Sequence, residues 1–221
     1  AGPVLSTGAC IRVKVFGKGS HGSMPHLGVD PVVLSAAIVT RLQTIVAREI
    51  GPGDFGVVTV GSLQAGTKAN IIPDDATMLL NIRAYDLAVR DTLLAAIERI
   101  VRAECDAAGS PRPPEIELYE SYPLTDNDEA VNAKVTKAFI DHFGEDRVRH
   151  LSPVPASEDF SVIPDAYGIP YCYWGFGGFT ADQQPVPNHN PGFGPAMQPT
   201  LTTGTEAAVT AVLAYLGGAR A

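Results

Sequence analysis

The hydrophobic positions of residues 9–120 follow two different periods, and each change of period marks the start of a new element. Around Ile11, Val13 and Val15 the apolar side chains alternate with charged ones, which is typical of a half-buried strand. Elsewhere they recur three and four residues apart, as on one face of a helix. The pattern predicts strands at 9–16, 55–63, 76–85 and 115–119, and helices at about 30–50 and 87–108.

The predicted order of these elements is strand, helix, strand, strand, helix, strand. This order is typical of the split βαβ or ferredoxin-like arrangement, in which both helices cover one face of a four-stranded antiparallel sheet. Asp30 before Pro31 is expected to cap the first helix, and Gly109 is expected to end the second. An edge strand without a neighbour is a natural contact for dimerisation.

Residues 121–221 have a different pattern, in which helices and strands alternate. The predicted elements are a helix at about 128–143, strands at 148–151 and 169–174, a Gly/Pro-rich loop over 175–199 and a closing helix over 203–216. Such alternation indicates part of an α/β sheet, and a loop of this length is usually functional. We expect a remnant or linker at 1–8, a first domain at 9–120, and at 121–221 part of a second domain that needs a partner half.

Composition and charge narrow the class of protein. The chain has 221 residues, of which 45% are hydrophobic, and this is enough for a buried core. Its net charge is −8 and its Lys and Arg residues do not cluster, so nucleic acid is not an expected partner. No apolar run or basic leader predicts a membrane span or a signal peptide. The three cysteines are odd in number and far apart, which favours a reducing cytoplasm over a disulfide framework.

Two histidines stand out because of the loops that hold them. His189 lies in Pro-Asn-His-Asn-Pro, where the prolines are expected to keep the backbone extended. A lone histidine is more often hydrogen-bonded than metal-bound, since a metal site needs about three or four ligands. His21 lies in a Gly-rich turn between a strand and a helix, and its simplest interpretation is an exposed surface histidine. That turn lacks the endings of phosphate and dinucleotide loops.

Four further positions each have a structural and a functional interpretation. Asn70 lies in a turn, where Asn usually bonds its own backbone. Arg83 is on one face of a strand, either as a solvated charge or as a fork for a carboxylate. Glu158 is one of two adjacent acids, which are most often simply exposed. The loop around Gly177 is either a tight turn or a set of free N–H groups for an anion.

Several stretches, in order along the chain, resemble those of a known family. They are Gly-x-x-x-His-x-x-x-Pro at 17–25, Asn-x-Ile-Pro at 70–73, Arg-x-x-Asp at 83–86, Ser-Glu-Asp-Phe at 157–160 and Pro-Asn-His-Asn-Pro at 187–191. The family comprises metal-dependent aminoacylases, hippurate hydrolases and indole-acetyl-amino-acid hydrolases, and the resemblance covers its back half. It implies an α+β, ferredoxin-like lid domain used for dimerisation, followed by the C-terminal part of an α/β zinc-peptidase-like catalytic domain.

The resemblance also implies roles for individual residues. His189 would be a metal ligand, and His21 would reach the active site of the neighbouring subunit and stabilise an oxyanion. The substrate-binding positions that it implies are Asn70, Arg83, Glu158 and Gly177. The intact enzyme would hold two divalent metal ions (Zn, Mn, Ni or Co) and hydrolyse the amide bond of a small-molecule N-acyl amino acid as a homodimer.

The family's front half is missing from this sequence. Its Cys-Gly-His motif, its Glu-Glu pair and a further His supply most of the metal ligands and the general base, and none of these motifs occurs here. We therefore expect the chain to be inactive alone. The alternative is a non-catalytic dimerisation or small-ligand-binding module derived from such a hydrolase.

Overall fold

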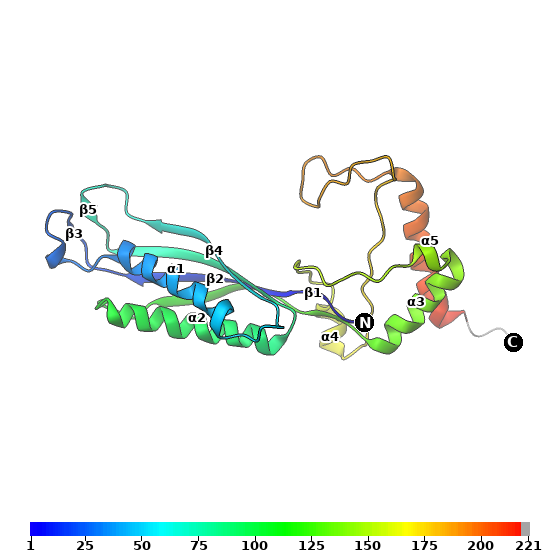
Figure 1. Ribbon diagram of the computed structural model, residues 1–221, viewed down its shortest axis with the longest axis horizontal. Helices are drawn as coiled ribbons and strands as arrows, with labels where there is room; N and C mark the ends of the chain where they lie inside the picture. The colour runs from blue at the N-terminus through cyan, green and yellow to red at the C-terminus, as the bar shows by residue number, and fades with distance from the viewer. Residues whose placement is uncertain (218–221) are drawn as a thin grey trace. The chain divides into compact units, whose positions relative to one another are not determined.

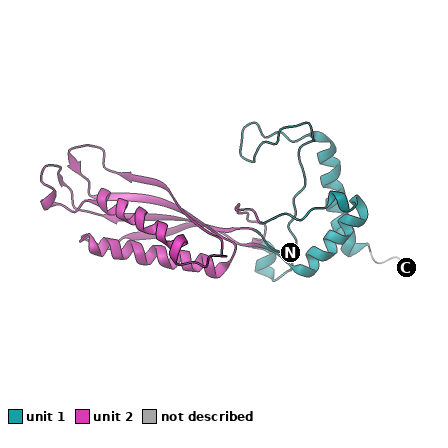
Figure 2. Cartoon of the chain, in the orientation of Figure 1, with its two compact units in different colours: residues 1–4, 126–152, 163–221 teal, residues 5–125, 153–162 magenta. Residues whose placement is uncertain are grey.

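The computed structural model describes residues 1–217 and divides them into two compact units (Figure 1; Figure 2). Unit 2, magenta in Figure 2, comprises residues 5–125 and 153–162, and unit 1, teal, comprises the other described residues. Unit 2 is discontinuous because the later segment returns to the first residues of this unit. Leu5 forms a parallel bridge with Val154, and the Ser6 N–H donates to the Ala156 carbonyl at 2.8 Å.

The centre of unit 2 is a four-stranded sheet in which all neighbouring strands are antiparallel. Its spatial order is β4 (Gly56–Ala65), β6 (Asp75–Ala84), β2 (Thr7–Phe16) and β7 (Glu115–Tyr122). The register places Val13 opposite Met78 and Gly8 opposite Arg83. Alternate residues of β6 are buried, as the period-two pattern predicts. The ferredoxin-like arrangement predicted from the sequence is confirmed, with β4 and β7 as the two edges of this sheet.

Two helices pack side by side against this sheet, α1 (Pro31–Arg48) and α2 (Leu87–Ala107) (Figure 1). Their apolar faces and the inward residues of the strands form one core. The largest fully buried side chains of this core are Ile11, Ile38, Leu42, Ile45, Met78, Leu80, Ile82, Leu93 and Ile97. Burial of a large aliphatic side chain contributes about 1.5–3 kcal/mol, so this cluster is the main source of stability in unit 2.

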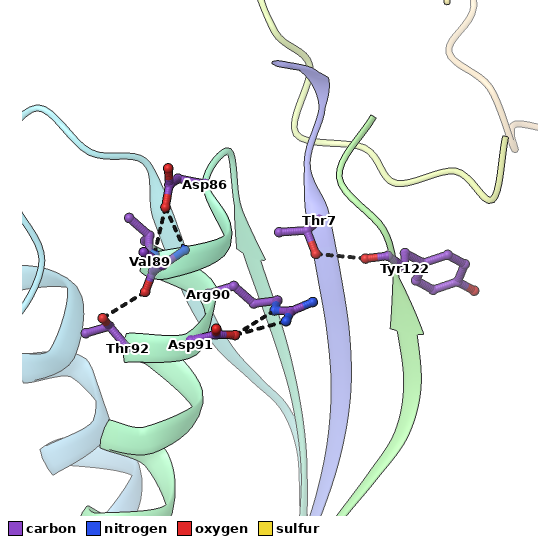
Figure 3. A network of polar contacts seen from close by, with 8 residues as sticks. Thr7, Asp86, Val89, Arg90, Asp91, Thr92 and Tyr122 are labelled. Atoms are coloured by element: carbon purple, nitrogen blue, oxygen red, sulfur yellow. Dashed lines mark hydrogen bonds and ion pairs between the residues drawn. The ribbon is translucent and has the colours of Figure 1, made fainter. Parts of the chain in front are cut away.

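The ends of both helices are fixed by the residues that the sequence offers there. Asp30 accepts the Val32 N–H at 2.8 Å and precedes Pro31, so the predicted cap is confirmed. Asp86 caps α2 in the same way (Figure 3), which gives the Asp of the Arg-x-x-Asp stretch a structural role. Gly109 ends α2 at φ 68°, and the N–H of Ser110 donates to the Cys105 carbonyl, as in a Schellman motif.

Helix α1 is long and apolar enough to cross a membrane when length and composition alone are considered. The expectation that no segment of the chain has these properties is therefore wrong. The buried positions of α1, which include Leu34, Ile38 and Leu42, all face one side and belong to the core of unit 2. This is the pattern of an amphipathic core helix.

Unit 1 is built mainly from helices. Its elements are β1 (Gly2–Leu5), which pairs with β8 (Thr125–Asn127), α3 (Glu129–Phe143), the 3₁₀ turn η2 (Glu145–Arg147), α4 (Val162–Tyr167) and α5 (Met197–Leu216). Helices α3 and α5 pack together, and a small buried cluster lies between α3, α5 and Cys172. The extended backbone of Gln198 interrupts the first turn of α5, and the regular part of the helix begins after this residue. The helix predicted at 203–216 lies within that regular part and is confirmed.

The strands predicted at 148–151 and 169–174 are wrong. A strand needs a ladder of backbone hydrogen bonds with a neighbour. Residues 169–174 have a backbone neighbour in the segment around Asp128, whose N–H donates to the Tyr171 carbonyl at 3.0 Å, but no strand is formed there. The side chain of Asn127 takes the place of such a ladder beside this segment: its Oδ1 accepts the Tyr173 N–H at 2.6 Å and its Nδ2 donates to the Tyr173 carbonyl at 2.8 Å. Alternation of apolar residues therefore led to an extended segment but not to a sheet.

Candidate functional site

The loop that carries His21 is held by close backbone contacts at its base. Lys18 and Val29 exchange two backbone hydrogen bonds, at 2.8 and 3.0 Å. A Cβ on Gly17 would lie 2.3 Å from the Val29 carbonyl oxygen, and one on Gly28 would lie 2.6 Å from the Lys18 carbonyl oxygen. Neither glycine has a positive φ. These glycines are therefore required by close approach rather than by unusual backbone conformation.

The His21 ring is exposed and oriented by Ser23. The backbone N–H of Ser23 donates to His21 Nδ1 at 3.2 Å, and the Ser23 hydroxyl lies 2.7 Å from the same nitrogen. A backbone N–H can only donate, so Nδ1 is an acceptor and the proton of the neutral ring is on Nε2. His21 therefore presents an N–H donor away from its own loop, which is the group that an oxyanion requires.

Asn70 lies directly beside His21. Strand β3 (Ser20–His21) pairs with β5 (Ile71–Ile72), and the Gly22 N–H donates to the Asn70 carbonyl at 2.8 Å. Asn70 is exposed, and its side-chain amide forms no hydrogen bond within residues 1–217. The Asn70 amide thus stays available at the His21 loop, in contrast to the self-bonded turn Asn that is the simplest interpretation of the sequence.

Arg83 lies at the other end of the sheet and is half-buried. Its Nε donates to Asn81 Oδ1 at 3.0 Å, and its Nη1 donates to the Ser157 hydroxyl. It is therefore not the freely solvated charge of the simplest interpretation. Three of its five N–H donors remain for a ligand.

Glu158 follows Ser157 in the segment that returns to unit 2. Its side chain is exposed, and Oε1 accepts the Asp159 N–H at 2.9 Å. Ser157 donates its hydroxyl hydrogen to the Ser6 carbonyl at 2.8 Å, which ties this segment to the residue that precedes β2. Glu158 is thus next to the residue that holds Arg83, while His21 and Asn70 lie beyond the opposite end of the same sheet.

Gly177 lies in unit 1, and so do three phenylalanines of the same loop. Gly177 is exposed, and the N–H groups of 175–178 donate no hydrogen bond within the described part of the chain. Phe179 and Phe193 form an edge-to-face pair with centroids 5.7 Å apart. Phe176 instead lies against α5, where a Cβ on Gly204 would be 3.0 Å from its ring.

His189 is exposed and has a backbone φ of 66°, so the expected extended conformation is wrong. The Asn190 N–H donates to the Pro187 carbonyl at 3.3 Å and closes a turn with His189 in its third position, where a left-handed φ occurs in type II turns. The restriction that proline imposes falls on the residue before it, which here is Asn190 and not His189.

The residues described here do not make up a metal site. No group of three or more His, Cys, Asp or Glu side chains that could hold a metal ion occurs within residues 1–217. Of the buried thiols, Cys105 and Cys172 both have a raised pKa because burial disfavours the thiolate, and that of Cys105 rises to about 11. Both belong to cores, and neither is set up as a metal ligand or nucleophile.

Comparison with known proteins gives the family. Residues 7–108, which include the whole of the βαββα part of unit 2, match the model of the peptidase dimerisation domain. The chain belongs to the M20 peptidase family. It comprises the dimerisation domain of that family followed by part of the catalytic region.

Among curated relatives, a thermostable carboxypeptidase 2 of Saccharolobus solfataricus is 37% identical over 72% of this chain and 40% of its own length. A hippurate hydrolase of Campylobacter jejuni is 32% identical over 78% of this chain and 45% of its own length. The chain therefore spans less than half the length of the curated relatives it matches.

Two solved structures are similar to this M20 chain. A putative aminohydrolase from methicillin-resistant Staphylococcus aureus has a TM-score of 0.86 and 32% identity over 97% of this chain and 54% of its own. The Bacillus subtilis YXEP protein, described as a dinuclear metal-binding peptidase of the M20 family, has a TM-score of 0.60 and 22% identity over 76% of this chain and 40% of its own. The latter likeness concerns the fold alone.

The structure thus brings the sequence-predicted residues of unit 2 into two groups, His21 with Asn70 and Arg83 with Ser157 and Glu158. Sequence reasoning missed Ser23 and Asn81 as partners of His21 and Arg83. Asn81 was within reach of prediction, because period-two alternation places it on the same face of β6 as Arg83. Ser23 carried no comparable signal.

Proposed function

We propose that this M20 chain is the dimerisation domain and C-terminal catalytic part of a metal-dependent amidohydrolase that cleaves N-acyl amino acids or similar small amides. The observation that carries the proposal is the pairing of two donor sites in unit 2. At one end of the sheet His21 offers an Nε2–H and the adjoining turn carries a free Asn70 amide, and at the other end Arg83 offers a cationic fork. A carboxylate and a developing oxyanion are the two negative groups of such a substrate.

In this proposal His189 is one ligand of a two-metal site whose other ligands lie outside the 221 residues. Bound divalent metals would supply the activation of water. The chain's own residues would do the remaining work. Arg83 would bind the carboxylate, while Asn70 and His21 of the neighbouring subunit would orient the amide and donate to the oxyanion. Glu158 and Gly177 would line the substrate site. On this basis the chain is inactive alone.

A homodimer through the dimerisation domain is part of the same proposal. Strand β4 is a sheet edge ten residues long. The neighbouring helix α1 leaves Val32, Val33 and Val46 exposed. An open edge beside exposed apolar side chains favours pairing with a second copy. The same edge is the observation that favours the second candidate, a dimerising or small-ligand-binding module without catalytic activity.

The test is the metal content of the full-length gene product beside the 221-residue chain, measured by elemental analysis. We expect about two equivalents of a divalent metal in the long form, as for a co-catalytic site, and little in the short form. Hydrolysis of N-acetyl and N-benzoyl amino acids by the long form would follow. A long form that binds no metal and hydrolyses none of these substrates would overturn the hydrolase and leave the module.

A further inference from the structure

Arg83 is held from two sides before any ligand arrives. On its own strand Asn81 accepts the Nε–H at 3.0 Å. From the segment that returns to unit 2, the Ser157 hydroxyl accepts from Nη1, and this hydroxyl is itself fixed because it donates to the Ser6 carbonyl at 2.8 Å. The three side chains are half-buried, which weakens the competition from water.

The orientation of Asn81 is fixed by its own partners. Its Nδ2 donates to the Ala9 carbonyl at 3.3 Å and lies 3.3 Å from Cys10 Sγ. A carbonyl can only accept and a guanidinium can only donate, so the amide nitrogen faces β2 and the amide oxygen faces Arg83. The acceptor that holds Arg83 is therefore itself anchored to the neighbouring strand.

Gly8 leaves the space that this arrangement needs. It is paired with Arg83 across the β2–β6 ladder. A Cβ at this position would lie 2.8 Å from Ser157 Oγ and 2.9 Å from Arg83 Nη1. Any larger residue would thus enter the contact between these two side chains.

We propose that Asn81 and Ser157 are positioning residues for Arg83, which they hold in a fixed orientation with Nη2 free of protein partners within residues 1–217. This inference rests on the proposed role of Arg83 as the carboxylate-binding residue. An arginine side chain has many rotamers, and ordering it before the substrate arrives removes part of the entropy cost of binding. Because Ser157 precedes Glu158, the same contact joins the arginine fork to the acidic segment.

The first measurement is NMR on the 221-residue chain, using the ¹⁵N-labelled Nε–H groups of its arginines. Arg83 should exchange its Nε–H with water slowly. Asn81→Ala should speed this exchange about tenfold, as loss of a charged hydrogen bond predicts, and Ser157→Ala should speed it severalfold. Ser157→Thr, which keeps the hydroxyl, should restore slow exchange. Ser152→Ala, an exposed serine without a hydroxyl hydrogen bond among the described residues, is the matched control.

The second measurement is titration of the same proteins with N-acetylglycine and with its neutral carboxamide. N-acetylglycine should shift the Arg83 signal, the carboxamide should not, and Ser157→Ala should weaken N-acetylglycine binding several-fold. Fast wild-type exchange, or variants that leave both exchange and affinity unchanged, would overturn the inference. Faster exchange with unchanged affinity would also overturn it, since Ser157 would then be only structural. If N-acetylglycine leaves wild-type Arg83 unmoved while the variants still speed its exchange, the clamp of the proposed function fails and the holding of Arg83 is upheld.

Discussion

Replacement of Gly17 by alanine tests whether close backbone approach explains the glycines at the base of the His21 loop. Gly17 is buried, and a Cβ on it would lie 2.3 Å from the Val29 carbonyl oxygen and 2.6 Å from Pro31 Cδ. Neither atom is the end of a flexible side chain. The Val29 oxygen also accepts the Lys18 N–H at 2.8 Å, so moving it breaks a hydrogen bond of the bridge.

The magnitude follows from three contributions to the free energy of unfolding. Overpacking costs about 1–3 kcal/mol, and loss of one backbone hydrogen bond costs about 1 kcal/mol. The lower entropy of the unfolded alanine chain offsets about 0.4–1 kcal/mol. The expected net destabilisation is about 2 kcal/mol. For a unit of this size that corresponds to a fall in melting temperature of roughly 8 °C.

The assay is thermal unfolding of the chain followed by far-ultraviolet circular dichroism. Gly53→Ala is the matched control, because a Cβ on Gly53 meets no atom within 4 Å. We expect the control to unfold within about 2 °C of the wild type, since it changes only the unfolded chain. Equal melting temperatures for Gly17→Ala and Gly53→Ala would refute the argument from close approach.

Three further predictions concern single side chains. If the full-length protein is the proposed hydrolase, His21→Ala should lower its kcat about 100-fold. Mixing this variant with His189→Ala should restore activity, because one site of each hybrid dimer is intact. Mixtures as inactive as either variant would exclude action in trans. Burial raises the pKa of the Cys105 thiol in the folded chain to about 11, against an ordinary 9.0. Between these two pH values the unfolded chain binds fewer protons than the folded chain, so the free energy of unfolding should fall by about 2 kcal/mol as pH rises. Parallel pH–stability curves for wild type and Cys105→Ala would contradict this. Gly8→Ala should speed exchange of the Arg83 Nε–H with little loss of stability, because its Cβ meets only the ends of side chains; an unchanged NMR signal would show that the contact tolerates a methyl group.

The sequence predicted the elements of unit 2 well because each follows from local chemistry. The alternation around Val13 and the helix cap at Asp30 each depend only on residues a few positions away in the sequence. The strand predicted at 169–174 was wrong because strand pairing depends on a neighbouring strand, which the pattern of apolar residues does not reveal. The φ of His189 likewise depends on closure of a turn rather than on the prolines beside it.

The candidate site shows the same division between local and distant information. Asn81 and Arg83 are two residues apart on one strand, so their shared face could be read from the alternation. Ser157 is 74 residues beyond Arg83, and its contact arises only because residues 153–162 return to unit 2. No spacing rule links them, and only the folded chain shows the pair.

That return has a consequence for how this domain can be exchanged between relatives. The dimerisation-domain match ends at residue 108, whereas unit 2 takes in residues 153–162 as well. If the dimerisation domain were transferred to a relative as one contiguous segment, Ser157 would not be transferred with it. Arg83 would then meet the residue that the recipient protein has at that position. A chimaera that keeps the contact between Arg83 and Ser157 needs two transferred segments, the dimerisation domain and residues 153–162. Natural recombination of this domain is subject to the same requirement.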